Sequence, residues 1–260
     1  PLFRSWLETA NLAKQVVSSS LSASGENLLV ELDLAPMEAA ETTLLDHAPT
    51  SAVEAVCMIE IIRQSLSDAG RSDGRDARAL DAIAAMGQVE RHRFVDTALA
   101  NQAYEDTSLP IGLGQTISKP NVVARMIELL CEGRTEKLGR VLEIGTGCGY
   151  QAAVLSQVSR EVYSMERLRG LHEKARENVR GLRLANLHLL FGDGMLGFAQ
   201  GAPYAAIIAA AGGEAIPQAW IDQLAVGGRL VAPAVTGVGQ QHLVVIDKTA
   251  TGVKKTVLEP

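Results

Sequence analysis

VLEIGTGCGY, residues 141–150, is the stretch that decides the fold of this 260-residue chain. The apolar run Val141–Ile144 predicts a buried strand. Gly145, Gly147 and Gly149 follow it at alternate positions, before a predicted helix. Glycines allow a tight turn, and the free N–H groups at a helix start can bind an anionic group. The spacing differs from the dinucleotide G-x-G-x-x-G and from the P-loop, so the stretch predicts a strand–turn–helix unit that binds another kind of ligand.

Similar apolar runs alternate with helical patterns over the second half of the chain. Strands are predicted at Val141–Ile144, Glu161–Met165, Leu187–Phe191, Tyr204–Ala210, Arg229–Ala232 and His242–Ile246. Helices are predicted at Pro120–Cys131, Tyr150–Val158, Leu168–Val179 and Pro217–Leu224. Buried strands separated by helices predict an α/β, doubly wound, mostly parallel sheet of the Rossmann-like type. The last strands lack an intervening long helix, which predicts an antiparallel edge.

Two acids lie where the next predicted strands end. Glu166 follows the glycine turn by about 20 residues, a position from which a carboxylate can accept hydrogen bonds from ribose hydroxyls. Asp193, between Gly192 and Gly194, can face an adenine amino group at the same sheet edge. Taken singly, Glu166 would be an acid at a helix start and Asp193 a turn residue. Together with the glycine turn, they predict a nucleoside site.

The first part of the chain has a different pattern. Residues 1–50 are Ser-rich and acidic without a sustained period, which predicts a poorly ordered or loosely attached segment. Helical patterns at Ser51–Ala69 and Arg75–Met86 predict an N-terminal helical extension. We therefore expect three parts: residues 1–50, a helical cap with a substrate and cofactor loop at 51–118, and an α/β domain at 119–260.

Composition narrows the function classes. A formal net charge of −6 without a basic cluster argues against a broad nucleic-acid footprint. Cys57, Cys131 and Cys148 are far apart, so we expect no disulfide framework, no zinc site and a reducing cytoplasm, with Cys148 a small loop residue. No run approaches about 18 apolar residues, so we expect neither a membrane span nor a secretion signal. Pro1 suggests that this numbering begins inside a longer or processed product.

Asn101–Ser118 is predicted to be a loop before the helix that begins near Pro120. Its glycines and hydroxyls are compatible with a lid or substrate loop. From local chemistry alone, the favoured interpretation of Ser118 is the N-cap of that helix.

The run Tyr104–Pro120, with its core LPIGLGQTISKP, resembles the signature segment of the protein-L-isoaspartate O-methyltransferases. Val141–Ala152 (VLEIGTGCGYQA), Val162–Arg167 (VYSMER), Gly192–Gly194 and Gly227–Pro233 (GGRLVAP) resemble the same family. The resemblance covers about Val89 to Pro260, and the segment that contains Ser118 is its most specific part.

The resemblance implies transfer of a methyl group from S-adenosylmethionine to the α-carboxylate of L-isoaspartyl residues in damaged proteins and peptides. The resulting ester would collapse to a succinimide, which lets part of the damage revert to aspartate. Ser118 would be the active-site hydroxyl, because it occupies the matching position. The implied cofactor-binding residues are Gln115, Thr116, Glu143, Gly145, Thr146, Gly147, Gly149, Glu166, Arg167, Asp193 and Gly194. No metal, nucleic acid or membrane partner is expected.

Three features depart from the family pattern, one being that residues 1 to about 75 lie outside the part common to the family. Ala205 stands where the family usually has aspartate. The chain stops at Leu258-Glu259-Pro260, where relatives usually continue into a closing strand, so an open sheet edge is expected and self-association is left undecided.

Two alternative functions remain open from the sequence. The first is methylation of a small molecule or a nucleic-acid base, although base-modifying enzymes commonly have an Asn/Asp-Pro-Pro-Tyr-like turn where this chain has Ala209–Gly213. The second is cofactor binding without catalysis, with Ser118 only a helix cap.

Overall fold

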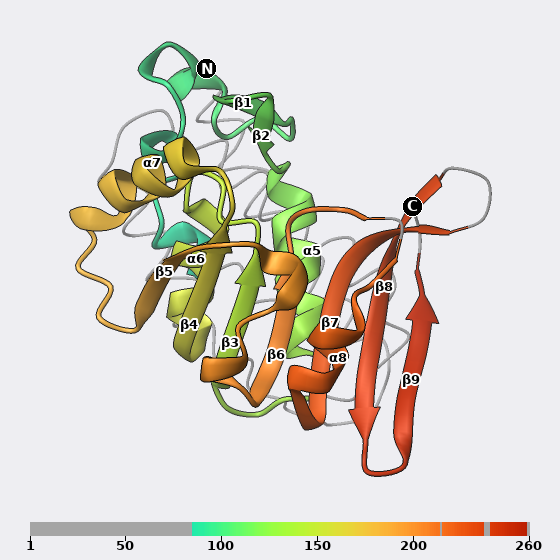
Figure 1. Ribbon diagram of the computed structural model, residues 1–260. Coiled ribbons are helices and arrows are strands. Elements are labelled where there is room, and N and C mark those ends of the chain that lie inside the picture. Colours follow the sequence, from blue (N-terminus) through green and yellow to red (C-terminus); the bar gives the residue numbers. More distant parts are fainter. Residues whose placement is uncertain (1–84, 214, 237–239, 259–260) are drawn as a thin grey trace, which may run out of the picture.

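The apolar runs predicted as strands lie side by side in one sheet in the computed structural model, which describes residues 85–213, 215–236 and 240–258 (Figure 1). The sheet contains β3 (Leu138–Ile144), β4 (Ser159–Glu166), β5 (Leu187–Phe191), β6 (Tyr204–Ala209), β7 (Leu224–Thr236), β8 (Gln240–Thr249) and β9 (Gly252–Val257). The helices are α5 (Pro120–Cys131), α6 (Tyr150–Val158), α7 (Arg169–Arg180) and α8 (Gln218–Gln223). Short 3-10 turns are η1 (Arg91–Phe94), η2 (Thr97–Gln102), η3 (Gly194–Leu196) and η4 (Ala199–Gly201).

The strand order confirms the predicted fold class. The strands are arranged β5-β4-β3-β6-β7-β8-β9. Those from β5 to β7 are parallel, whereas β8 and β9 add antiparallel pairs at one edge. Because parallel strands end at the same edge, the turns that follow β3, β4, β5 and β6 meet there.

Alternate side chains of each strand point to opposite faces, so the sheet is buried on both. Val141 of β3 and Ala206 of β6 pack in a cluster with Ile127 of α5 and Leu155 of α6. On the opposite face, Leu142, Ile207 and Leu230 pack with Trp220 of α8. The continuous apolar runs were a correct indicator of this two-sided burial.

Three strands were not predicted. The segment expected to be a loop, Asn101–Ser118, begins with the last two residues of η2 and contains an antiparallel hairpin of β1 (Leu109–Gly112) and β2 (Gln115–Ile117). These strands are too short to show a period, and their turn depends on left-handed backbone at Gly112, Leu113 and Gly114. β9 was also missed because its pattern is mostly polar; it pairs with β8 and forms the sheet edge there.

The expectations for residues 1–84 lie outside the described residues. Of the helix expected over Arg75–Met86, only Ala85 and Met86 are described, and both are helical. In the part of the chain that is described, no helix has the length and apolar character needed to span a membrane.

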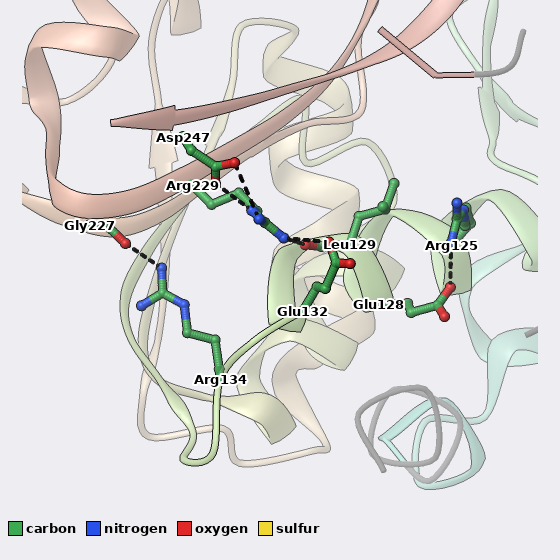
Figure 2. Close-up of polar contacts among 8 residues, drawn as sticks. All are labelled: Arg125, Glu128, Leu129, Glu132, Arg134, Gly227, Arg229 and Asp247. Carbon is green, nitrogen blue, oxygen red and sulfur yellow. Dashed lines mark hydrogen bonds and ion pairs between the residues drawn. The ribbon is translucent and has the colours of Figure 1, made fainter. Parts of the chain in front are cut away.

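Arg229 of β7 connects the end of α5 to the antiparallel edge of the sheet through hydrogen bonds (Figure 2). Its guanidinium donates to Asp247 through Nε at 2.6 Å and to Glu132 and the Leu129 carbonyl at 2.8 and 2.9 Å. The side chain is 17% exposed. The neighbouring Arg134 makes a single contact, a 2.7 Å bond to the Gly227 carbonyl. Arg229 is therefore the more important link between these elements.

Candidate active site

Most of the predicted site residues line one pocket at the carboxyl edge of the parallel strands, to which the β1–β2 hairpin also contributes. Its lining includes Gln115, Thr116, Ser118, Gly145, Thr146, Gly147, Glu166, Arg167, Asp193 and Gly194. Glu143 and Gly149 are not among the lining residues: Glu143 is fully buried in β3, and Gly149 precedes the first residue of α6. These two residues can support the pocket from behind rather than form its wall.

The glycine turn has the tight backbone that its sequence predicted. Gly145, Gly147 and Gly149 have φ angles of +90°, +57° and +92°, a region that side chains rarely adopt. A Cβ on Gly147 would lie 3.2 Å from Ile111 of the hairpin. The glycines therefore let the hairpin approach the end of β3 closely.

Glu166 joins the glycine turn to the start of α7. Its Oε2 accepts from the Gly147 N–H at 2.8 Å, and its Oε1 accepts from the Leu168 N–H at 2.9 Å. Glu166 is therefore an acid at a helix start, as its position in the sequence suggested when taken singly. Each carboxylate oxygen keeps a second lone pair, so these bonds leave Glu166 able to accept from a ligand as well.

A buried polar chain lies behind the turn. The Thr146 hydroxyl contacts the Ser164 hydroxyl at 2.6 Å, and Ser164 donates to Oε2 of Glu143. The pKa of Glu143 is raised to about 8, mainly by burial and to a smaller extent by the nearby charge of Glu166, while hydrogen bonding by Ser164 and Gln151 opposes the shift. Oε1 of Glu143 and Nε2 of Gln151 are both buried, and neither makes a hydrogen bond of normal geometry with the described residues.

The Glu143 carboxyl should make stability depend on pH. An unfolded glutamate has a pKa near ~4.3. The folded protein binds this proton more tightly, so the contribution to stability is complete below about pH 4 and is lost as pH rises through about 8. A Glu143→Gln variant should therefore gain thermal midpoint relative to wild type between about pH 5 and about pH 9. Calorimetry checks this, with exposed Glu177→Gln as control; parallel pH profiles for wild type and Glu143→Gln would contradict it.

Asp193 and Gly194 form the wall that follows β5. Asp193 accepts from the Met195 N–H at 3.0 Å, so it does cap a turn. A Cβ on Gly194 would lie 2.5 Å from Ile144, and its carbonyl accepts from Trp220 Nε1 at 2.7 Å. This close packing brings the end of β5 against the end of β3.

Ser118 is not the helix cap that local chemistry favoured. The N-cap of α5 is Lys119, without a side-chain cap bond, because Pro120 already begins the helix and has no N–H to satisfy. The Ser118 side chain is partly buried at the pocket. The hairpin before it is held to α7 by a 3.0 Å bond from Lys174 Nζ to the Ile111 carbonyl.

Gln151 is a pocket residue that the sequence did not single out. It lies one residue into α6 and is 7% exposed. A polar residue in the first turn of a helix that follows a glycine turn was the available signal. Cys148 is buried, and burial raises the pKa of its thiol, which agrees with a structural loop residue.

Ala205 lies away from the pocket. It is the second residue of β6, and the pocket residues Ala210 and Ala211 follow the other end of that strand. Its methyl group faces Gly139, where a Cβ would come within 3.1 Å. The alanine at position 205 therefore changes the end of β6 that lies away from the pocket.

A parallel sheet of this order, with a glycine turn after β3 and an acid at the end of β4, is a Rossmann-like fold with a nucleoside site at its carboxyl edge. The family match places the chain in the class of S-adenosylmethionine-dependent methyltransferases. Residues 50–259 match the protein-L-isoaspartate(D-aspartate) O-methyltransferase family. The chain belongs to that family.

Individual relatives agree with this assignment. The chain is 62% identical over 195 residues to a protein-L-isoaspartate O-methyltransferase of Methylibium petroleiphilum, covering 74% of this chain and 71% of the relative. It is 61% identical over 185 residues to one of Leptothrix cholodnii, covering 70% of this chain but only 64% of that relative.

Solved structures show the same fold. One, described as a protein-L-isoaspartate O-methyltransferase, superposes with a TM-score of 0.60 at 28% identity, covering 77% of this chain and 62% of the other. Another, a Plasmodium falciparum protein in complex with S-adenosyl-L-homocysteine, has a TM-score of 0.59 at 23% identity, covering 76% and 93%.

Proposed function

We propose that this chain transfers a methyl group from S-adenosylmethionine to the α-carboxylate of L-isoaspartyl residues in damaged proteins and peptides. The observation that carries the proposal is the position of Ser118. The segment with the most specific family resemblance, Tyr104–Pro120, brings this hydroxyl to the pocket that contains the glycine turn and Glu166. The family match spans both parts.

The pocket fits the methyl donor in three respects. Gly145 and Gly147 line the pocket with backbone and carry no side chain that could project into it. Glu166 can accept from ribose hydroxyls, and Asp193 and Gly194 lie where adenine would bind. Gln151, in the first turn of α6, adds a polar side chain to the pocket lining.

S-adenosylmethionine, when bound, supplies an electrophilic methyl group on its sulfonium. The other reactant needs no activation, because an α-carboxylate has a pKa near ~3.5 and is ionised at neutral pH. Accordingly, the proposed mechanism assigns no general base to this chain. The protein instead orients the carboxylate and excludes water, effects that can supply several kcal/mol.

Ser118 has the role of orienting that carboxylate. Its hydroxyl can donate one hydrogen bond to a carboxylate oxygen, which leaves the other oxygen to attack the methyl group. Gln115 and Thr116 precede it in β2 and complete this side of the pocket. The new bond joins the carboxylate oxygen to the methyl carbon while the sulfur–methyl bond breaks and sulfur keeps its electron pair, so the products are a methyl ester and S-adenosylhomocysteine.

Methyl transfer to a short isoaspartyl peptide tests the proposal. We expect methylation of that peptide but not of its aspartyl counterpart. Ser118→Ala should lower kcat about 10- to 100-fold, since a hydrogen bond to a charged group contributes about 1.5–3 kcal/mol. Ser108→Ala is the matched control, because Ser108 is exposed in the same segment and is not part of the pocket lining.

Two outcomes would contradict the proposal. Cofactor binding without methylation of the isoaspartyl peptide would favour a cofactor-binding protein that lacks this activity. Equal methylation of both peptides would point to another substrate.

We further propose a cytoplasmic location and the division of the chain into residues 1–50, 51–118 and 119–260.

A further inference from the structure

Arg91 is a buried arginine next to the proposed active site. It begins η1 and is 1% exposed. Its Nε donates to the Ala103 carbonyl and its terminal NH2 to the Ser118 carbonyl, both at 2.7 Å. The guanidinium carbon lies 5.0 Å from the ring centroid of Tyr150.

The two carbonyls that Arg91 binds belong to residues on either side of one chain segment. Ala103 and Ser118 flank Tyr104–Ile117, the segment that contains the β1–β2 hairpin. One guanidinium therefore holds both ends of that segment. The strands of the hairpin are only 4 and 3 residues long. A pair so short has little stability by itself, so the position of the segment depends on such attachments.

The contact between Arg91 and Tyr150 connects the hairpin segment to the glycine turn. Tyr150 is the first residue of α6 and directly follows Gly149. Its ring also packs edge to face with Phe94 of η1, with centroids 5.5 Å apart. Arg91 thus links Ser118 to the helix that begins behind the cofactor side of the pocket.

We propose that Arg91 is a positioning residue for methyl transfer, which places the Ser118 hydroxyl by clamping both ends of the hairpin segment against Tyr150. This inference rests on the function proposed above. The geometry requires arginine, because a planar guanidinium has diverging N–H donors and can stack on a ring, whereas a lysine ammonium is a point donor on a flexible stem. A shift of about 1 Å in the position of a catalytic group can cost ~100-fold in rate.

A double-mutant cycle between Arg91 and Ser118 tests the inference. The variants are Arg91→Lys, Ser118→Ala and both together, assayed for kcat and KM on the isoaspartyl peptide, for S-adenosylmethionine affinity and for thermal midpoint. We expect Arg91→Lys to lower kcat about 10-fold in the wild-type background and less than about 2-fold in Ser118→Ala, because the two residues act through one group. The Kd for S-adenosylmethionine should change less than about 3-fold.

Arg93→Lys is the matched control. Arg93 lies in the same turn, but its side chain is 45% exposed and pairs with Glu90, so its kcat should equal that of wild type. Arg91→Gln serves as a second variant, since its amide can still donate to one carbonyl. It should show the same coupling to Ser118.

Each other outcome overturns the inference. If Arg91→Lys lowers kcat by the same factor with and without Ser118, Arg91 does not act through that residue. If neither Arg91 variant folds at the assay temperature, the role of Arg91 is structural. If the wild-type protein does not methylate the isoaspartyl peptide, the proposed function itself is wrong. If the wild-type protein is active but the effects of the two substitutions are additive, only the role of Arg91 is wrong.

Discussion

A Glu166→Gln variant is expected to bind S-adenosylmethionine about 100-fold more weakly than wild type, a loss of about 2.7 kcal/mol. The two carboxylate oxygens of Glu166 accept from the Gly147 and Leu168 N–H groups. A glutamine at this position would place its NH2 group against one of those donors. It would also lose the negative charge, which strengthens bonds from ribose hydroxyls by about 1 kcal/mol each. Both effects act on one side of the cofactor site.

Titration calorimetry with S-adenosylmethionine measures this effect directly. Glu177→Gln is the matched control, because it makes the same chemical change on an exposed position of α7 and should leave the affinity unchanged. The thermal midpoint of each variant without cofactor separates lost binding from lost folding. A Kd within about 3-fold of wild type for Glu166→Gln would show that this carboxylate does not contact the cofactor.

Replacing Arg229 with methionine is expected to lower the free energy of unfolding by about 2 kcal/mol. The change removes the bonds to Asp247, Glu132 and the Leu129 carbonyl shown in Figure 2. The carboxylates of Asp247 and Glu132 are about one third exposed, so they regain some hydration. This is why the loss should be smaller than the roughly 3–5 kcal/mol typical of a broken buried pair.

Chemical denaturation measures the Arg229 effect. Arg134→Met is the control, since it removes a similar side chain that makes one exposed bond to the Gly227 carbonyl, and it should cost less than about 0.5 kcal/mol. Cofactor affinity should be retained in the folded Arg229 variant, because Arg229 does not line the pocket. Equal destabilisation by both substitutions would refute the special importance of Arg229.

The sheet was predictable because its signal is local and repeated. The limits of α5, α6 and β5 were predicted as the structure has them, since each has a continuous apolar pattern between clear helix or turn signals. β7 was predicted too short, because Gly227 and Gly228 interrupt its apolar run. β9 was missed because GVKKTV has no apolar alternation, and its strand conformation depends on pairing with β8.

The residues of the proposed site also divide into those that the sequence could predict and those that it could not. The glycine turn, Glu166 and Asp193 could be placed at one sheet edge because parallel strands end together. Nothing local indicated how deeply Gln151 would be buried, because its burial depends on neighbours far away in the chain. The failure of Ser118 to cap α5 has a local cause, since Pro120 begins the helix directly after Lys119.

By itself, the sequence determined the parallel sheet, the place of the tight glycine turn and the resemblance to the family, because each is encoded in contiguous residues whose apolar pattern or backbone freedom is local. Only the tertiary structure decided that the β1–β2 hairpin adjoins the pocket and that Glu143 has a pKa of about 8. It also decided that Arg91 binds Ala103 and Ser118 together. Burial and hydrogen bonding between distant segments depend on distances that the chain acquires only on folding.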